Sequence, residues 1–179
     1  MEISGVNIDS AITSADVRGS FQKIYFNGTA ASEWEKLSEI FLTKSVQGTV
    51  RGMHLQWGTC SANKFVKCIE GKILDILIDL RVKSPTFCKT IKIELNGADD
   101  KVITIPHGVA HGYQVLSEEA IVIYGTDQDW CVKCDIGVHP ESLFGGWPLS
   151  PMILSDRDTL LPSLEDFISS TSLTFGVSH

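Results

Sequence analysis

The feature that most constrains this chain is a series of short segments rich in Val, Ile and Thr, spaced by roughly ten residues. From residue 46 onward apolar and polar residues alternate with the two-residue period of a β-strand. Turn signals such as Asn96-Gly97 and Pro106-His107-Gly108 separate the segments. This pattern predicts a mainly β protein, a jelly-roll (double-stranded β-helix) barrel with short flanking helices. The expected strands are 49–55, 64–70, 72–80, 90–95, 101–105, 112–116 and 120–126.

The chain is expected to form one domain over residues 1–179, because it contains no repeat, no low-complexity tract and no Pro/Ser-rich linker. Helix is predicted only near the ends. Ser32-Glu33-Trp34-Glu35 has the form of a capping box and precedes apolar residues at helical spacing, which predicts a helix over 32–41. The stretch after Pro148 is typical of a loop, and 163–167 indicates the start of a terminal helix.

The charge and the cysteines exclude several classes of protein. A net charge of -7 does not favour binding to nucleic acid or to an anionic membrane. No apolar run approaches the length of a membrane span and the N-terminus lacks the pattern of a signal peptide, so we expect a cytoplasmic protein. Cys131 and Cys134 form a C-x-x-C motif without a second pair, so we interpret all five cysteines as reduced and unpaired thiols, with a zinc or redox role of the motif as the less favoured alternative. The five are Cys60, Cys68, Cys88, Cys131 and Cys134.

Two histidines follow strand-like segments and are candidates for chemistry. His111 ends the run Pro106-His107-Gly108-Val109-Ala110-His111, which has the form P-x-G-x-x-H, and His54 lies in Arg51-Gly52-Met53-His54-Leu55-Gln56. Metal-binding cupins use an H-x-H pair and a Glu in their first motif, whereas His54 has no partner two residues on. Two histidines without a carboxylate at ligand spacing are too few for a metal site, so we expect no metal and no cofactor.

Without a metal, four residues make a different set. His54, Lys64, His111 and Tyr124 provide a base, a cation, a hydrogen-bond donor and a weak acid, and all can project into a barrel from its strands. Removing a proton beside a ketone needs a base and a group that stabilises the enolate oxygen. Inversion of the carbon also needs a proton delivered from the opposite face.

These residues carry a resemblance to the dTDP-4-dehydrorhamnose 3,5-epimerase family of sugar-nucleotide epimerases, which have the cupin fold. The resemblance covers about residues 16–167. It is carried by the following motifs in order: Arg18-Gly19-Ser20-Phe21, Arg51-Gly52-Met53-His54-Leu55-Gln56, Lys64-Phe65-Val66, Asp79-Leu80-Arg81, Ser84-Pro85-Thr86-Phe87, Ile105-Pro106-His107-Gly108-Val109-Ala110-His111-Gly112, Trp147-Pro148 and Leu154-Ser155-Asp156-Arg157-Asp158.

The resemblance implies a metal-free and cofactor-free epimerase of a nucleotide-linked 4-keto-6-deoxy sugar. His54 would be the base, Asp158 would orient it, Lys64 would hold the C4 oxygen and Tyr124 would reprotonate the carbon from the other face. Substrate binding would fall to Arg51, His111, Gln56, Trp130 and Trp147, and across a homodimer to Arg18, Phe21 and Lys23. The dimer would exchange its N-terminal strands, residues 1–28, and an O-antigen, lipopolysaccharide or antibiotic-sugar pathway is suggested by analogy alone.

Two departures from the family pattern bear on specificity. Lys23 stands where the family usually has Glu, and a cationic donor suits the bare N3 of cytosine better than the N3–H of thymine. We therefore hypothesise a CDP-linked substrate. Trp130 stands where many members have Tyr, and a bulkier ring beside the sugar would hinder the ring flip that presents C5. A C3-only epimerase and a double epimerase of C3 and C5 therefore both remain open.

Two alternatives remain open from the sequence. A 3,4-ketoisomerase on the same fold would move the carbonyl instead of inverting a centre, although that family lacks the lysine and the dyad aspartate seen here. A non-catalytic cupin that binds a sugar or a metal is the second alternative.

Overall fold

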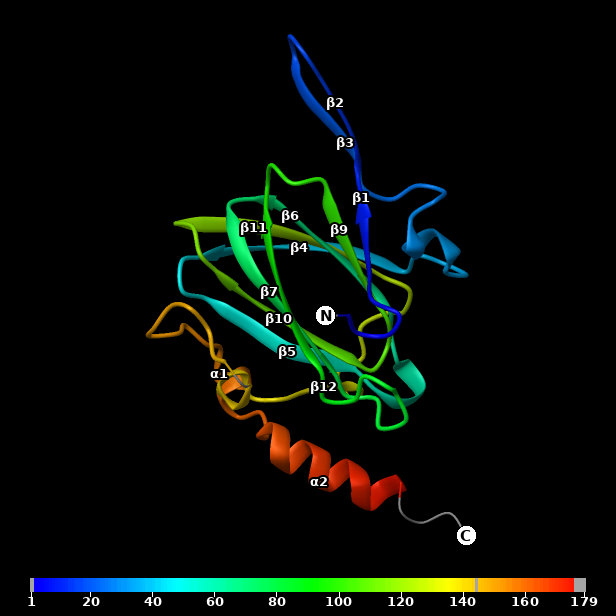
Figure 1. The fold of residues 1–179 in the computed structure, drawn as a ribbon, viewed down its shortest axis with the longest axis vertical. Coiled ribbons are helices and arrows are strands. Elements are labelled where there is room, and N and C mark those ends of the chain that lie inside the picture. The colour runs from blue at the N-terminus through cyan, green and yellow to red at the C-terminus, as the bar shows by residue number, and fades with distance from the viewer. Residues whose placement is uncertain (1, 144, 176–179) are drawn as a thin grey trace.

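A computed structural model of the chain describes residues 2–143 and 145–175, and it shows two five-stranded antiparallel sheets that face each other (Figure 1). One sheet has the strand order β1-β9-β6-β11-β4 and the other has the order β12-β5-β10-β7-β8. Successive strands alternate between the sheets from β4 to β7 and again from β8 to β12, as in a jelly roll. The predicted cupin-type jelly roll is therefore confirmed.

The strands begin and end close to the expected positions. The seven predicted strands correspond to β5 to β11, and the largest difference is that β10 begins three residues earlier than expected. The strands are β1 (Asn7–Ser10), β2 (Ile12–Asp16), β3 (Gly19–Lys23), β4 (Glu39–Val46), β5 (Val50–Gln56), β6 (Lys64–Glu70), β7 (Lys72–Asp79), β8 (Thr90–Asn96), β9 (Lys101–Ile105), β10 (Val109–Val115), β11 (Glu119–Thr126) and β12 (Asp135–Gly137).

The helices lie outside the sheets (Figure 1). The expected terminal helix is present as α2 (Leu164–Phe175), and the stretch interpreted as a loop contains the one-turn helix α1 (Asp156–Thr159). The described residues also form three 3₁₀ turns: η1 (Ala30–Glu33), η2 (Gly58–Cys60) and η3 (Pro140–Ser142). Among the described residues, no helix has both the length and the apolar character needed to span a membrane.

The helix predicted over 32–41 is wrong. Only the 3₁₀ turn η1 forms there, and residues from Glu39 onward pair with β11 over eight positions as strand β4. An isolated ten-residue helix has only marginal stability, whereas a strand at residues 39–46 supplies hydrogen-bond partners to the backbone of β11. Trp34 and Leu37 still bury apolar surface, against the cluster that contains Phe65.

The main core fills the space between the sheets and is built from inward-facing apolar residues of both. It brings together Val66, Ile103 and Val122 from one sheet with Leu77 and Val115 from the other. A second apolar cluster lies on the outer face of the β5/β10/β7 sheet and receives Phe167 of α2. Both faces of that sheet are therefore covered, which explains why every residue of β10 is buried.

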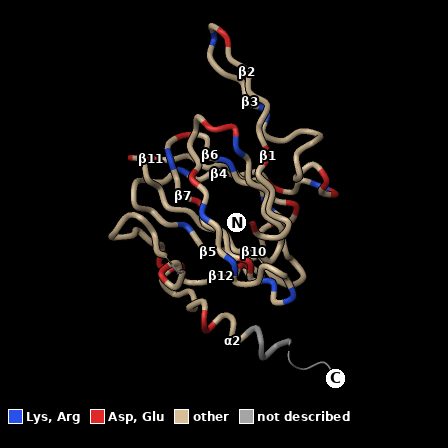
Figure 2. Tube along the Cα trace, viewed as in Figure 1, with Lys and Arg blue, Asp and Glu red and all other residues tan. Residues whose placement is uncertain are grey.

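The β2–β3 hairpin extends away from the barrel (Figure 1). All five residues of β2 are exposed, and Ile12 and Phe21 present apolar side chains to solvent. Figure 2 shows both signs of charge at the hairpin tip, where Arg18 is paired with Asp16 at 2.6 Å.

Candidate active site

A cavity of about 320 Å³ opens at one end of the barrel between the two sheets. Strands of both sheets line it, and the short helix α1 closes one side. Eight of the twelve residues predicted for the site line it: His54, Tyr124, Asp158, Lys64, Arg51, His111, Gln56 and Trp130. The remaining lining residues are Glu39, Phe41, Thr43, Leu55, Ala62, Thr126, Gln128, Asp135, Ser155 and Arg157.

Gly52 allows the two histidine-bearing strands to approach closely. Its φ is +134°, and a Cβ at this position would collide with Gly112 Cα on β10. In the resulting register His54 on β5 lies directly opposite His111 on β10. The motifs that carry these histidines are 57 residues apart in sequence (111 − 54), yet the sheet places them side by side.

His54 is paired with Asp158. The distance between His54 Nε2 and Asp158 Oδ1 is 2.6 Å, and the carboxylate is almost completely buried. Burial raises the pKa of Asp158, but the hydrogen bond and charge of His54 outweigh it, so the net pKa lies below the ordinary value. An anionic Asp158 accepts a hydrogen bond from Nε2–H, which assigns the free lone pair of the imidazole to Nδ1.

Helix α1 positions Asp158. The Ser155 hydroxyl accepts a hydrogen bond from the Asp158 backbone N–H at 3.2 Å and caps the helix. The sequence Ser155-Asp156-Arg157-Asp158 has the same spacing as a capping box, and this signal could have revealed the helix before the structure was known.

Lys64 lies beside His54, on the opposite sheet. Its Nζ donates a hydrogen bond to the backbone carbonyl of His54 at 3.3 Å. Loss of hydration in the cavity lowers the pKa of Lys64 to about 8, against the charges of Asp135 and Asp75, which raise it. The lysine is therefore a cation at neutral pH with a proton that is less firmly held than usual.

Tyr124 enters the cavity from β11, in the same sheet as Lys64. Phe41 stacks on it with ring centroids 4.7 Å apart and an interplanar angle of 10°. Burial is the main cause that raises the pKa of Tyr124 well above its ordinary value, so the phenol stays protonated.

His111 is held by an aspartate that the sequence analysis missed. Its Nε2 lies 2.8 Å from Asp75 Oδ2, and both side chains are buried. The other oxygen, Asp75 Oδ1, has no hydrogen-bond partner among the described residues. The signal was an acidic residue inside the otherwise apolar run Ile73-Leu74-Asp75-Ile76-Leu77, because a buried carboxylate needs a partner.

The polar residues at the cavity mouth hold one another in place. Arg51 Nε donates to Ser45 Oγ at 2.9 Å, and Trp130 Nε1 donates to Asp135 Oδ2 at 2.9 Å. Arg157 forms an ion pair with the same Asp135 at 2.8 Å. Neither Asp135 nor Arg157 was singled out as a binding residue from the sequence, and both line the cavity.

Four predicted binding residues do not reach this cavity within one chain. Arg18, Phe21 and Lys23 lie on the exposed β2–β3 hairpin. Trp147 packs against the cluster around Met53 and Ile76, and its Nε1 donates to the Pro140 carbonyl at 3.1 Å.

Comparisons with known proteins agree with this fold and site. A family model for dTDP-4-dehydrorhamnose 3,5-epimerase matches residues 1–166. A dTDP-4-dehydrorhamnose 3,5-epimerase of Shigella flexneri is 35% identical over 118 residues, 65% of this chain and 65% of that protein. A dTDP-4-dehydrorhamnose 3-epimerase of Streptomyces niveus is 32% identical over 149 residues, 80% of this chain and 72% of that protein.

The solved structures include a similar fold. The crystal structure of NovW, a 4-keto-6-deoxy sugar epimerase from the novobiocin biosynthetic gene cluster of Streptomyces spheroides, superposes with a TM-score of 0.89. It is 29% identical, and the match covers 96% of this chain and 88% of NovW. A jelly roll with this cavity thus defines the class, an isomerase of the sugar-nucleotide epimerase type. The chain belongs to the dTDP-4-dehydrorhamnose 3,5-epimerase family, and the predicted resemblance is confirmed.

Proposed function

We propose that this protein inverts C3 of a nucleotide-linked 4-keto-6-deoxy hexose by removing and returning a proton next to the C4 ketone. One observation carries the proposal. The His54–Asp158 pair and the phenol of Tyr124 line a single cavity from opposite sheets, with the Lys64 ammonium beside His54. A sugar held between the sheets would meet a base on one face and an acid on the other.

The reaction follows from these positions. His54 Nδ1 takes the C3 proton, and the C–H electron pair becomes the C3–C4 double bond of an enolate whose charge rests on O4. Lys64 donates a hydrogen bond to O4 as that charge develops. Tyr124 then delivers its hydroxyl proton to the opposite face of C3, the carbonyl re-forms, and the proton on His54 returns to the phenolate through solvent. No electron is gained or lost over the cycle.

Solvent exchange tests the proposal. In D₂O the wild-type protein should place deuterium at C3 of the substrate, and His54→Ala should abolish this label. The matched control is His107→Ala, because His107 is exposed and does not line the cavity. Label retained by His54→Ala at the wild-type rate would contradict the role of His54, and a product with the carbonyl moved to C3 would identify a 3,4-ketoisomerase.

The number of centres inverted depends on Trp130. Trp130 lines the cavity, is 61% exposed and donates a hydrogen bond to Asp135, and we propose that its ring hinders the turn by which a bound sugar would present C5. We propose a reaction limited to C3, and relatives named both 3,5-epimerase and 3-epimerase occur among the similar proteins. Label at C3 alone supports this limit and label at both carbons contradicts it, whereas Trp130→Tyr should admit label at C5.

We propose that the nucleotide is CDP, because the cationic Lys23 suits the bare N3 of cytosine. The relatives are named for dTDP-linked sugars, so the test is a direct comparison of binding. The wild-type protein should bind the CDP-linked sugar more tightly than the dTDP-linked one, and Lys23→Glu should reverse the order. A clear wild-type preference for dTDP would remove the proposal.

We also propose that the active protein is a homodimer. The hairpin with Arg18, Phe21 and Lys23 is exposed in the single chain, and so are Ile40 and Leu42 on β4, one of the two edge strands of its sheet. Exposed apolar strand edges of this kind are suited to pairing with a second chain. A partner hairpin laid along this edge would bring its three binding residues to the mouth of the cavity. A cytoplasmic location stays a prediction.

A further inference from the structure

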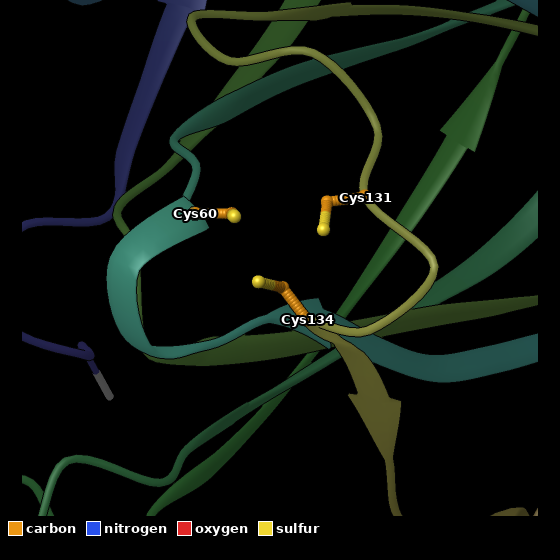
Figure 3. A group of neighbouring side chains, drawn as sticks. All are labelled: Cys60, Cys131 and Cys134. Atoms are coloured by element: carbon orange, nitrogen blue, oxygen red, sulfur yellow. The ribbon is translucent and has the colours of Figure 1, made fainter.

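Three cysteines that lie apart in the sequence meet beside the active-site cavity. Cys60 ends η2, and Cys131 and Cys134 belong to the loop between β11 and β12. Figure 3 shows the three side chains pointing toward one another, and their sulfur atoms all lie within 4.8 Å of each other. The sequence analysis interpreted Cys131 and Cys134 as a pair without a second half. The fold supplies the third thiol from 71 residues upstream (131 − 60).

The backbone holds this cluster in place without any bound group. The Cys134 N–H donates to the Cys131 carbonyl at 3.0 Å, which closes the C-x-x-C segment into a tight turn. The Trp57 N–H donates to the Cys134 carbonyl at 2.8 Å, and the Cys131 N–H donates to Gln56 Oε1 at 2.6 Å. The two segments that carry the cysteines are thus joined by hydrogen bonds before any ligand is considered.

We propose that Cys60, Cys131 and Cys134 bind one Zn²⁺ ion, with water in the fourth position. A tetrahedral zinc site has Zn–S distances of about 2.3 Å, which places its sulfur atoms roughly 3.8 Å apart. Sulfur atoms that already lie within 4.8 Å reach this geometry by small side-chain rotations. Each thiol binds as a thiolate, so up to three protons pass to solvent when the metal enters.

The chemistry of the set favours zinc over a disulfide. A disulfide joins two sulfur atoms and would leave the third thiol without a role, whereas a zinc ion uses all three. All three cysteines are partly exposed, so a cation and its water can enter. Among the described residues, this is the one group of three or more potential ligands close enough to hold a metal.

The site would support the rim of the cavity rather than the reaction. Gln56 and Trp130 both line the cavity, and both contact Cys131. The Gln56 side chain accepts a hydrogen bond from the Cys131 N–H, and Trp130 precedes Cys131 in the chain. A metal bound here would hold the loop that carries Trp130 against the end of β5.

Metal binding is measured on the purified full-length protein, independently of any substrate. The reduced wild-type protein should retain one zinc per chain after dialysis, and Co²⁺ in its place should give thiolate-to-cobalt absorption in the near ultraviolet. Cys60→Ser, Cys131→Ser and Cys134→Ser should each reduce zinc affinity by at least tenfold. Cys88→Ser is the matched control, because Cys88 is also partly exposed but lies outside the cluster.

The proposal is overturned by three results. These are a wild-type protein that takes up neither zinc nor cobalt when reduced, zinc retention that survives Cys60→Ser unchanged, and a Cys131–Cys134 disulfide in protein isolated with its zinc content at zero. None of these results bears on the sugar reaction, so this inference and the proposed function fail independently.

Discussion

At the scale of single residues, the surroundings in the cavity shift the pKa values of its ionisable side chains in different directions. Lys64 loses hydration and its pKa falls to about 8, while burial drives the pKa of Tyr124 upward. Asp158 remains an anion beside His54. Such opposite shifts in one cavity are typical of a site in which an acid and a base act in turn.

The lowered pKa of Lys64 predicts how kcat/KM changes at alkaline pH. Because its folded pKa is lowered to about 8, the lysine is charged below that pH and loses its charge as the pH rises through it. The value of kcat/KM should therefore fall above about pH 8. Lys64→Arg should move this fall to higher pH, and Lys64→Met should lower kcat/KM by about 10² or more at every pH. A Lys64→Met variant of near wild-type activity would show that the cation has no part in catalysis.

Replacing Tyr124 should separate hydrogen exchange at C3 from inversion of C3. In Tyr124→Phe the base remains, so His54 should still take the C3 proton and return solvent deuterium to the same face. Inversion should fall by about 10² to 10⁴, since the acid on the other face is missing. Mass spectrometry measures the exchange and NMR measures the epimer ratio. Loss of both together would place Tyr124 in binding or in support of the fold instead.

At the scale of the elements, the end of β7 depends on one buried carboxylate. Asp79 accepts hydrogen bonds from Arg81 at 2.8 Å and from the hydroxyls of Ser84 and Thr86 at 2.6 Å each. Arg81 in turn donates to the Ser4 carbonyl at 2.6 Å, so the same network fastens the N-terminal segment to the barrel. Burial raises the pKa of Asp79, but these donors outweigh it and the pKa falls to about 2.

Asp79→Asn should destabilise the protein by about 3 kcal/mol, because Arg81 loses its anionic partner in a buried place. Because the pKa of Asp79 is lower in the folded than in the unfolded protein, its carboxylate stabilises the fold at pH values above the unfolded pKa. This stabilisation is lost as the pH falls from about 4 toward 2. Urea unfolding at several pH values should show this slope in the wild type and a flatter one in Asp79→Asn. The control is Asp100→Asn at an exposed site, expected to change stability by less than about 0.5 kcal/mol.

At the scale of the whole molecule, β4 is an edge strand that presents large apolar side chains to solvent. Ile40 and Leu42 are 60% and 64% exposed on the edge strand, although β4 borders the cavity through Glu39, Phe41 and Thr43. One strand thus contributes to the cavity on one face and presents an apolar surface on the other. Dimerisation along this strand would link assembly to activity.

Leu42→Glu should therefore convert a dimer into monomers, and kcat/KM should fall as the partner's hairpin is lost. Analytical ultracentrifugation gives the mass and the exchange assay gives the activity. Val82→Glu introduces the same charge at an exposed apolar position in the β7–β8 loop and should leave both unchanged. A wild-type protein that sediments as a monomer with full activity would refute the dimer.

The sequence predicted those parts of the fold that depend on local pattern. Alternating apolar residues and turn residues located β5 to β11, because each of these strands has its own apolar face and is bounded by residues that favour turns. The same reasoning failed at 32–41, where pairing with β11 overrode a helical pattern. It also passed over α1, because a helix of one turn has no periodicity to detect.

The sequence by itself determined the chemical inventory: a jelly roll, two strand-borne histidines, a lysine, a tyrosine and an aspartate in a recognisable order. Only the tertiary structure decided which groups meet. Asp158 reaches His54 across 104 residues, a pairing that the family resemblance implied but no local pattern predicted. Asp75 holds His111, and Cys60 joins the Cys131-x-x-Cys134 turn. The physical reason is that a strand's local pattern specifies which face is buried, whereas the neighbour across that face depends on how the two sheets are connected and packed.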